Sequence, residues 1–256
     1  MRRASITEYT MGSLFAGIGG FELGFERARV ASGSTIKCVW QVEDNRFCQS
    51  VLQKHWPDVP RMGDVREFPP PGDWSVDIIT AGFPCTDISN AGRMDGIHGE
   101  HSGLYREAVR VVRLLRPRVF VVENVAALLV RGMDTLLGEL AEIGANVEWH
   151  VVPAAHLGAA HIRDRVYLFA YVDGEGLPFP REKEIFGARR REKGGESRRE
   201  ARWPDQPGVR RTSHGVPRRV DRIRSLGNAV CPPVSEWIAE LLIRTLDENS
   251  ACEAGR

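Results

Sequence analysis

Short apolar runs alternate with stretches of helical periodicity along the first two-thirds of the chain. The runs predict strands at residues 12–16, 36–42, 76–81, 119–122, 147–152 and 166–171. Between the runs, apolar side chains recur at helical spacing, as at Phe21, Phe25 and Ala28, which predicts helices in the connections. The run at 119–122 is rich in Val, which is typical of a strand buried on both faces. This alternation predicts the α/β class, with a doubly wound and mostly parallel sheet.

The periodicity fails between residues 173 and 214, where Gly, Pro, Arg and Glu are frequent. Order returns at residues 220–230, and a last helix is predicted from about Val234, just after Pro232 and Pro233. The sequence therefore predicts three parts, which are a core at 1–172, a small insert at 173–219 and a segment at 220–256 that returns to the core.

Charge is distributed unevenly along a chain whose formal net charge is only +1. Residues 181–222 hold fourteen Arg and Lys against seven Asp and Glu, which gives about +7 and leaves about −6 for the remainder. A basic block beside a mildly acidic body indicates a polyanionic partner. A solvated linker of the same composition explains the charge equally well.

Composition argues against a membrane protein and against a metal or disulfide framework. No apolar run reaches the ~18 residues that a spanning helix needs, and residues 1–10 lack the apolar stretch of a signal peptide. The five cysteines are odd in number and lack CxxC spacing. His98 and His101 have HxxH spacing, but Gly99 and its neighbours predict a loop there. We therefore expect a cytoplasmic protein with no membrane contact and no metal.

A glycine-rich segment, FAGIGG at residues 15–20, follows the first predicted strand. Glycines let backbone N–H groups approach a ligand closely at the N-terminus of a helix. A dinucleotide fingerprint needs a third glycine where Glu22 stands, which disfavours a nicotinamide oxidoreductase. Glu43 ends the second strand and Asp64 follows a turn, so both acids could accept hydrogen bonds from ribose hydroxyls. Each residue alone fits a tight turn or a solvated acid, but their order and spacing favour a nucleoside cofactor.

Two candidate reacting groups follow predicted strands. Cys85 lies in GFPCT, on a proline-constrained loop directly after the strand at 76–81. The thiolate is the reactive form of cysteine, and a structural cysteine would more often lie within an apolar run. Glu123 emerges from the buried run at 119–122, where burial can raise the pKa of its carboxyl so that it holds a proton. Asn124 beside it also fits a helix N-cap.

Two later segments are weaker signals. HIRDR at 161–165 places Arg163 and Arg165 on one side of an extended chain, where two guanidinium groups suit a phosphate or a polarised carbonyl. A surface ion pair with Asp164 is the plainer interpretation. SLGNAV at 225–230 indicates by itself only a turn before the last helix.

Taken in order, FAGIGG, the acids Glu43 and Asp64, GFPCT, ENV, HIRDR and LGNAV resemble the cytosine-C5 methyltransferase family of the bacterial and phage DNA type. The resemblance extends over nearly all of the chain outside the insert. It implies a Rossmann-like methyltransferase core at 1–172 and a target-recognition insert at 173–219. It also implies transfer of a methyl group from S-adenosylmethionine to carbon 5 of a flipped cytosine in double-stranded DNA.

The same resemblance implies roles for individual residues. The catalytic pocket would contain Cys85 as the nucleophile, Glu123 on the cytosine edge, and Arg163 and Arg165 as supporting groups. The residues expected to hold S-adenosylmethionine are Phe15, Ala16, Gly17, Ile18, Gly19, Gly20, Glu43, Asp44, Asp64, Val65, Pro84, Asn228, Ala229 and Val230. The residues of the insert expected to contact DNA are Arg189, Arg190, Arg191, Trp203 and His214.

Three positions depart from the family pattern. Thr86 and His161 stand where the family usually has Gln, and Ala81 stands where it usually has Gly. None of these departures removes a reacting group. The tRNA-methylating branch of the family and an inactive DNA-binding regulator on the same fold are the alternatives. GFPC favours the DNA branch, and the intact reacting residues argue against the regulator. We expect a monomer whose further partner is a cognate restriction endonuclease.

Overall fold

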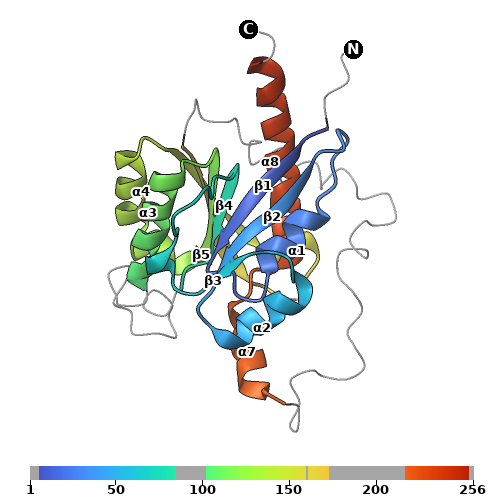
Figure 1. The fold of residues 1–256 in the computed structure, drawn as a ribbon, viewed down its shortest axis with the longest axis vertical. Coiled ribbons are helices and arrows are strands. Elements are labelled where there is room, and N and C mark those ends of the chain that lie inside the picture. The colour runs from blue at the N-terminus through green and yellow to red at the C-terminus, as the bar shows by residue number, and fades with distance from the viewer. Residues whose placement is uncertain (1–5, 85–101, 160, 173–216, 254–256) are drawn as a thin grey trace.

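The computed structural model describes residues 6–84, 102–159, 161–172 and 217–253, and in these ranges seven strands form one sheet (Figure 1). The strand order is β3-β2-β1-β4-β5-β7-β6. Neighbouring strands are parallel from β3 to β5, whereas β7 is antiparallel to both β5 and β6. The strands are β1 Glu8–Leu14, β2 Thr35–Val42, β3 Arg61–Met62, β4 Ile78–Ala81, β5 Val119–Val125, β6 Asn146–Pro153 and β7 Asp164–Tyr171.

Helices cover both faces of this sheet (Figure 1), which confirms the doubly wound α/β class. Along β5, Phe120 and Val122 join the apolar core beneath α3 and α4, whereas Val119 and Val121 join the core beneath α1 and α8. The Val-rich run therefore supplies both cores by simple alternation. The helices are α1 Gly20–Arg27, α2 Arg46–His55, α3 Tyr105–Leu115, α4 Met133–Glu142, α7 Arg219–Asn228 and α8 Pro232–Glu253. Short 3-10 turns are η1 Val65–Glu67, η3 Ser102–Leu104, η4 Ala126–Val130 and η5 Ala154–Leu157.

The main differences from the sequence-based prediction of strands concern β1, β5 and β3. β1 begins at Glu8 and ends at Leu14, so the expected strand at 12–16 lies too late in the chain. β5 continues past Val122 because Glu123 and Asn124 stay paired with β7. β3 was not predicted, because its two residues are too few to show a period.

The contact between α1 and α8 depends on glycine. A Cβ atom on Gly24 would lie 2.0 Å from Ser235 Oγ and 2.6 Å from the carbonyl oxygen of Pro232. Ser235 Oγ also donates a hydrogen bond to the carbonyl oxygen of Gly20 at 2.8 Å. Gly24 weakens the helical pattern in the sequence, but it lets the backbone of α8 approach α1 this closely.

Asp247 fixes the C-terminal part of α8 to the N-terminal strand. Its carboxylate accepts hydrogen bonds from the hydroxyls of Tyr9 at 2.9 Å, Ser32 at 2.5 Å and Ser34 at 3.0 Å. Burial and this carboxylate raise the pKa of Tyr9 to about 12. α8 has 22 residues, yet no helix in the described ranges is both long and apolar enough to cross a membrane.

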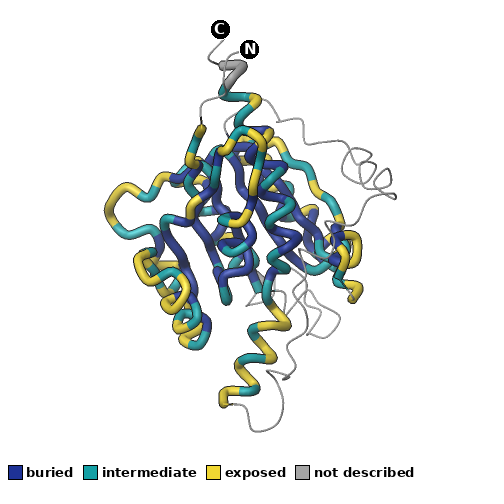
Figure 2. Tube along the Cα trace, turned by 90° about the vertical axis from the view of Figure 1, so that its right-hand side faces the viewer, coloured by how far each residue is buried: buried dark blue, intermediate teal, exposed yellow. Residues whose placement is uncertain are grey.

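α7 lies apart from the two apolar cores. It contains no buried residue, and Figures 1 and 2 show it at the foot of the molecule, opposite the end that holds the chain termini. Residues 225–228 form the last turn of this helix, so the expected isolated turn there is wrong. The C-terminal end of α7 reaches the edge of the sheet at which β1, β2, β4 and β5 end.

Candidate active site at the carboxyl ends of the strands

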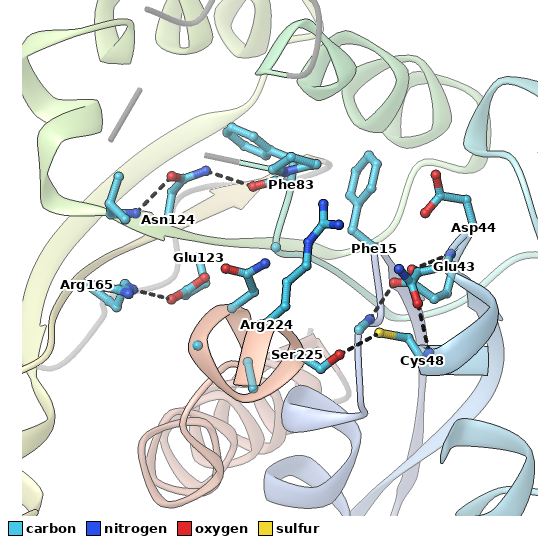
Figure 3. Close-up of a pocket in the computed structure, with 18 of the residues that line it drawn as sticks. Phe15, Glu43, Asp44, Cys48, Phe83, Glu123, Asn124, Arg165, Arg224 and Ser225 are labelled. Carbon is cyan, nitrogen blue, oxygen red and sulfur yellow. Dashed lines mark hydrogen bonds and ion pairs between the residues drawn. The ribbon is translucent and has the colours of Figure 1, made fainter. Parts of the chain in front are cut away.

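A pocket of about 230 Å³ opens at the carboxyl ends of the parallel strands (Figure 3). Its walls come from the loop after β1, the segment after β2, the residues after β4, the end of β5 and the C-terminal part of α7. Ligands of doubly wound folds bind in this crevice, because the sheet leaves space where the connections diverge. The residues that line the pocket therefore come from the beginning, the middle and the end of the chain.

The glycine-rich loop forms one wall in a conformation that glycine permits. Gly17 and Gly19 have φ of 59° and 86°, in the left-handed region, and Gly19 is the N-cap of α1. Glu43 holds this loop, because its Oε2 accepts a hydrogen bond from the Gly17 amide at 2.7 Å (Figure 3). Its Oε1 accepts one from the Asn45 amide at 2.8 Å. One carboxylate thus joins the loop after β1 to the segment after β2.

Glu43 and Asp44 place two carboxyl groups on this wall. Burial raises the pKa of Glu43, while the two backbone amides oppose that rise. Asp64 lies elsewhere, is partly exposed and pairs with Arg66 at 3.1 Å. Its pKa is lowered chiefly by the hydrogen bond from the Arg66 amide. Val65 is buried in the core beneath α3. Neither Asp64 nor Val65 lines the pocket.

The residues that precede Cys85 form the middle of the pocket. Gly82, Phe83 and Pro84 follow β4 and line the cavity. Asn124 fixes their path, because its Nδ2 donates to the carbonyl oxygen of Phe83 at 3.2 Å (Figure 3). Asn124 is buried within β5 and caps no helix, so the N-cap interpretation is wrong. Cys85 is the next residue in the sequence and lies outside the described residues.

Glu123 presents a buried carboxyl to the pocket from the end of β5. Its Oε1 lies 3.1 Å from Arg165 Nε, which is an ion-pair distance (Figure 3). The N–H is not aligned with that oxygen, so Oε1 accepts no hydrogen bond from the residues that the structure describes. Burial raises the pKa of Glu123 to about 6, although the charges of Arg165 and Arg163 oppose the rise. Such a group can hold, share or release a proton near neutral pH.

Arg163 has a different contact from Arg165. Its Nη2 donates to the carbonyl oxygens of Gly227 at 3.0 Å and Ala229 at 2.8 Å, at the end of α7. The two arginines therefore diverge, one to the carboxyl of Glu123 and one to the backbone at the end of α7. Within the described residues, neither arginine forms the predicted surface ion pair with Asp164, and Arg165 Nη1 donates instead to the backbone carbonyl oxygen of that residue.

The predicted site residues fall into three groups. Those that line the pocket are Phe15, Gly17, Glu43, Asp44, Pro84, Glu123, Arg163, Arg165, Asn228 and Ala229. Those that are described but lie outside its lining are Ala16, Ile18, Gly19, Gly20, Asp64, Val65 and Val230, and a Cβ on Gly20 would meet the carbonyl oxygen of Val230. Those that lie outside the described residues are Cys85, Arg189, Arg190, Arg191, Trp203 and His214.

Several residues that line the pocket were not among the predicted site residues, and they are Asn45, Cys48, Gly82, Phe83, Asn124, Val125, Arg224, Ser225 and Gly227. Asn124 was assigned to a cap, and nothing in its neighbourhood in the sequence indicates its bond to Phe83. Cys48 of α2 and Ser225 of α7 both line the pocket and contact each other directly, with Sγ and Oγ 3.5 Å apart. Arg224 extends from α7 into the cavity (Figure 3). Cys48 and Ser225 are 177 positions apart in the sequence, so no local pattern could indicate that α7 approaches α2.

Comparison with known proteins agrees with this geometry. A family model described as C-5 cytosine-specific DNA methylase matches residues 9–199. The Type II methyltransferase M.NlaIV of Neisseria lactamica is 29% identical over 189 residues, which cover 67% of this chain and 45% of that protein. The Type II methyltransferase M.BanI of Aneurinibacillus aneurinilyticus is 34% identical over 163 residues, which cover 60% of this chain and 36% of that protein. The chain thus spans less than half the length of these two relatives.

Solved structures share the fold. A DNMT2 mutant from Spodoptera frugiperda superposes with a TM-score of 0.55 at 19% identity, covering 69% of this chain and 54% of that one. The methyltransferase EhMeth of Entamoeba histolytica superposes with a TM-score of 0.52 at 15% identity, covering 69% and 55%. The family expected from the ordered motifs is confirmed, and the chain belongs to the C-5 cytosine-specific DNA methylase family.

Proposed function

We propose that this chain is a DNA cytosine-5 methyltransferase, with S-adenosylmethionine as the methyl donor and Cys85 as the nucleophile. The observation that carries the proposal is the setting of Glu123. Its buried carboxyl faces the same pocket as the glycine loop and Pro84, and its Oε1 has no hydrogen-bond partner among the described residues. A proton-holding acid of this kind suits the ring nitrogen of a base, and Pro84 leads directly to the candidate nucleophile.

The wall formed by residues 15–17 and 43–44 fits a nucleoside cofactor that carries a positive charge. Each oxygen of Glu43 accepts one backbone amide. A carboxylate oxygen can accept a further bond, so Glu43 can also bind ribose hydroxyls. The carboxyls of Glu43 and Asp44 favour a cationic ligand, and the ring of Phe15 offers an apolar surface. When bound, S-adenosylmethionine supplies an electrophilic methyl group.

Cys85 would supply the activation that cytosine lacks. Carbon 5 is a poor nucleophile until a bond forms at carbon 6. Attack by the Cys85 thiolate forms the S–C6 bond and moves the C5=C6 electron pair into the ring, which makes carbon 5 nucleophilic. Carbon 5 then takes the methyl group as the S–CH3 bond of the cofactor breaks, which leaves S-adenosylhomocysteine, and carbon 5 gives up its proton to a base or to water. The S–C6 bond breaks, and the thiolate and 5-methylcytosine are released.

Glu123 and Arg165 would control charge during this reaction. Burial raises the pKa of Glu123 to about 6, so its carboxyl holds a proton more readily than an exposed glutamic acid does. Donation of that proton toward N3 stabilises the negative charge that enters the ring when carbon 6 is attacked. Arg165, 3.1 Å from Glu123, stabilises the carboxylate that remains.

DNA recognition is assigned to the insert at residues 173–219. A cytosine within a duplex must leave the base stack to reach a pocket of this kind. The basic residues of the insert, Arg189, Arg190 and Arg191 among them, are proposed to contact phosphates, and Trp203 and His214 to contact bases. The name Type II methyltransferase of the two relatives supports a cognate restriction endonuclease as a partner.

Transfer of tritium from S-adenosyl-[methyl-³H]methionine tests the function. The purified chain is incubated in parallel with duplex phage DNA and with bulk tRNA, and the digested nucleosides are separated by chromatography. We expect label in 5-methyldeoxycytidine from DNA, and none with the Cys85→Ala variant. Label in 5-methylcytidine from tRNA alone would instead assign the chain to RNA. Binding of DNA without any label would make it an inactive DNA-binding regulator.

A further inference from the structure

Arg224 lies in the pocket without a role in the chemistry described above. Its side chain extends from α7 into the space between Phe15 and Glu123 (Figure 3). This places a guanidinium group between the wall assigned to the cofactor and the acid assigned to the cytosine.

The backbone that follows Arg224 is held by contacts from two other segments of the chain. The neighbouring Ser225 contacts Cys48 Sγ at 3.5 Å, and Arg163 donates to the carbonyl oxygens of Gly227 and Ala229. The rest of α7 has no buried residue, and Ile223 and Leu226 are exposed. The contacts of α7 therefore gather at the end that presents Arg224 to the pocket.

Most of the other charged groups of the pocket, with the exception of Asp44, are already engaged. Arg165 pairs with Glu123, Arg163 binds two carbonyl oxygens, and Glu43 accepts two backbone amides. Arg224, by contrast, has no hydrogen bond or ion pair with any residue that the structure describes. All five of its N–H donors are thus available to a ligand.

We propose that Arg224 binds an anionic oxygen group of the ligands in this pocket. A guanidinium binds carboxylates and phosphates through two parallel hydrogen bonds, which fixes orientation as well as charge. This inference rests on the proposed function, which brings two such groups to the cavity. One is the carboxylate on the methionine part of the cofactor, and the other is a phosphate beside the flipped cytidine.

The affinities of two ligands test whether the anion that Arg224 binds is the carboxylate of the cofactor. S-adenosylhomocysteine carries the carboxylate, whereas 5′-methylthioadenosine lacks it. If Arg224 binds the cofactor carboxylate, Arg224→Gln weakens binding of S-adenosylhomocysteine roughly ten- to a hundredfold and leaves 5′-methylthioadenosine unchanged. Arg224→Lys, which keeps the charge but not the paired donors, falls between the wild type and Arg224→Gln.

If Arg224 binds a phosphate, the affinity for S-adenosylhomocysteine is unchanged in Arg224→Gln. The KM for duplex DNA, measured by tritium transfer at saturating cofactor, then rises roughly tenfold or more. Arg222→Gln is the matched control, because it removes one positive charge from the same helix and Arg222 does not line the pocket. It should leave both measurements within about twofold of the wild type.

Measurements on the wild type distinguish a failure of the proposed role of Arg224 from a failure of the proposed function. If Arg224→Gln matches Arg222→Gln in both measurements while the wild type is active, the role of Arg224 is overturned and the proposed function stands. If the wild type neither binds S-adenosylhomocysteine nor transfers tritium, the proposed function fails, and the role of Arg224 fails with it.

Discussion

Arg163 Nη2 lies 2.8 Å from the carbonyl oxygen of Ala229, and this hydrogen bond joins the segment before β7 to the backbone that follows α7. The same nitrogen donates to Gly227 at 3.0 Å. Because α7 has no buried residue, few other contacts hold its end against the pocket. Arg163 is therefore a positioning residue for the wall that Asn228 and Ala229 contribute.

We expect Arg163→Gln to loosen this wall. Amide hydrogen exchange at residues 226–231 should become faster, and affinity for S-adenosylhomocysteine should fall roughly tenfold, because both carbonyl contacts are lost. Arg113→Gln is the control, since Arg113 is exposed and pairs with Glu142 at 3.6 Å, away from the pocket lining. Unchanged exchange at 226–231 in Arg163→Gln would show that other contacts hold the end of α7.

Replacement of Glu123 should separate chemistry from cofactor binding. Glu123→Ala is expected to lower kcat at least ~10²-fold, because the group that donates a proton toward N3 is lost. Affinity for S-adenosylhomocysteine should stay within about twofold, since Glu123 lies on β5 across the pocket from the glycine loop. Glu148→Gln, which changes a carboxyl on β6 outside the pocket lining, should affect neither. A kcat near that of the wild type in Glu123→Ala would remove Glu123 from the mechanism.

Gly24 should be among the glycines least tolerant of substitution. Gly24→Ala is expected to lower the free energy of unfolding by about 3 kcal/mol, because the new Cβ meets Ser235 Oγ and the backbone of α8. Gly138→Ala in α4 is the control, since nothing lies within 4 Å of its added Cβ. That change should stabilise the protein by about 0.5–1 kcal/mol, as a helical glycine replaced by alanine does. Urea unfolding measures both, and equal effects would mean that α1 and α8 are not so closely packed.

Glu22 should make stability depend on pH. It is buried on α1 and accepts a hydrogen bond from Gln41 at 3.0 Å, and burial raises its pKa from 4.5 to about 7. A raised pKa means that the folded state binds the proton more tightly than the unfolded state does. The stability that this proton contributes is therefore fully present below pH 4.5 and is lost as the pH rises through about 7. The free energy of unfolding of Glu22→Gln, relative to that of the wild type, should therefore increase by roughly 3 kcal/mol as the pH rises across this range.

Unfolding free energies measured at several pH values between 4.5 and 8 provide the test. Only the change with pH is compared, because glutamine also introduces an N–H group at the buried position. Glu8→Gln, at an exposed position, should run parallel to the wild type. A constant difference between Glu22→Gln and the wild type at every pH would mean that Glu22 titrates normally.

Most of the fold could be predicted from the sequence because its strands are buried on both faces. Residues 36–42, 119–122 and 166–171 are almost continuously apolar, and each lies within an observed strand. β3 could not be predicted, since two residues, Arg61 and Met62, carry no period. The start of β1 was placed too late, because Tyr9 and Met11 alternate with polar or small residues before the apolar run begins.

Site residues that belong to short sequence motifs could be predicted, whereas those that reach the site through contacts between distant parts of the chain could not. Glu43 and Glu123 stand at strand ends, so their place at one edge of the sheet follows from parallel topology. The partner of Asn124 is the carbonyl of Phe83, 41 residues earlier, which no local pattern indicates. Arg224 reaches the pocket only because the chain returns there after residues 173–216, and no periodicity in that segment predicts the return.

The central claim is that Cys85 bonds covalently to a cytosine, and trapping of that bond tests it most directly. A duplex copied from DNA that the protein methylates, with 5-fluorodeoxycytidine in place of every deoxycytidine, contains the target site even though its sequence is not known in advance. The fluorine at carbon 5 cannot leave as a proton does, so the S–C6 bond persists after methyl transfer. We expect a cofactor-dependent adduct that survives denaturation and that mass spectrometry locates on the peptide containing Cys85. An adduct on Cys48 or Cys231, or no adduct from a preparation that methylates ordinary duplex DNA, would contradict the assignment.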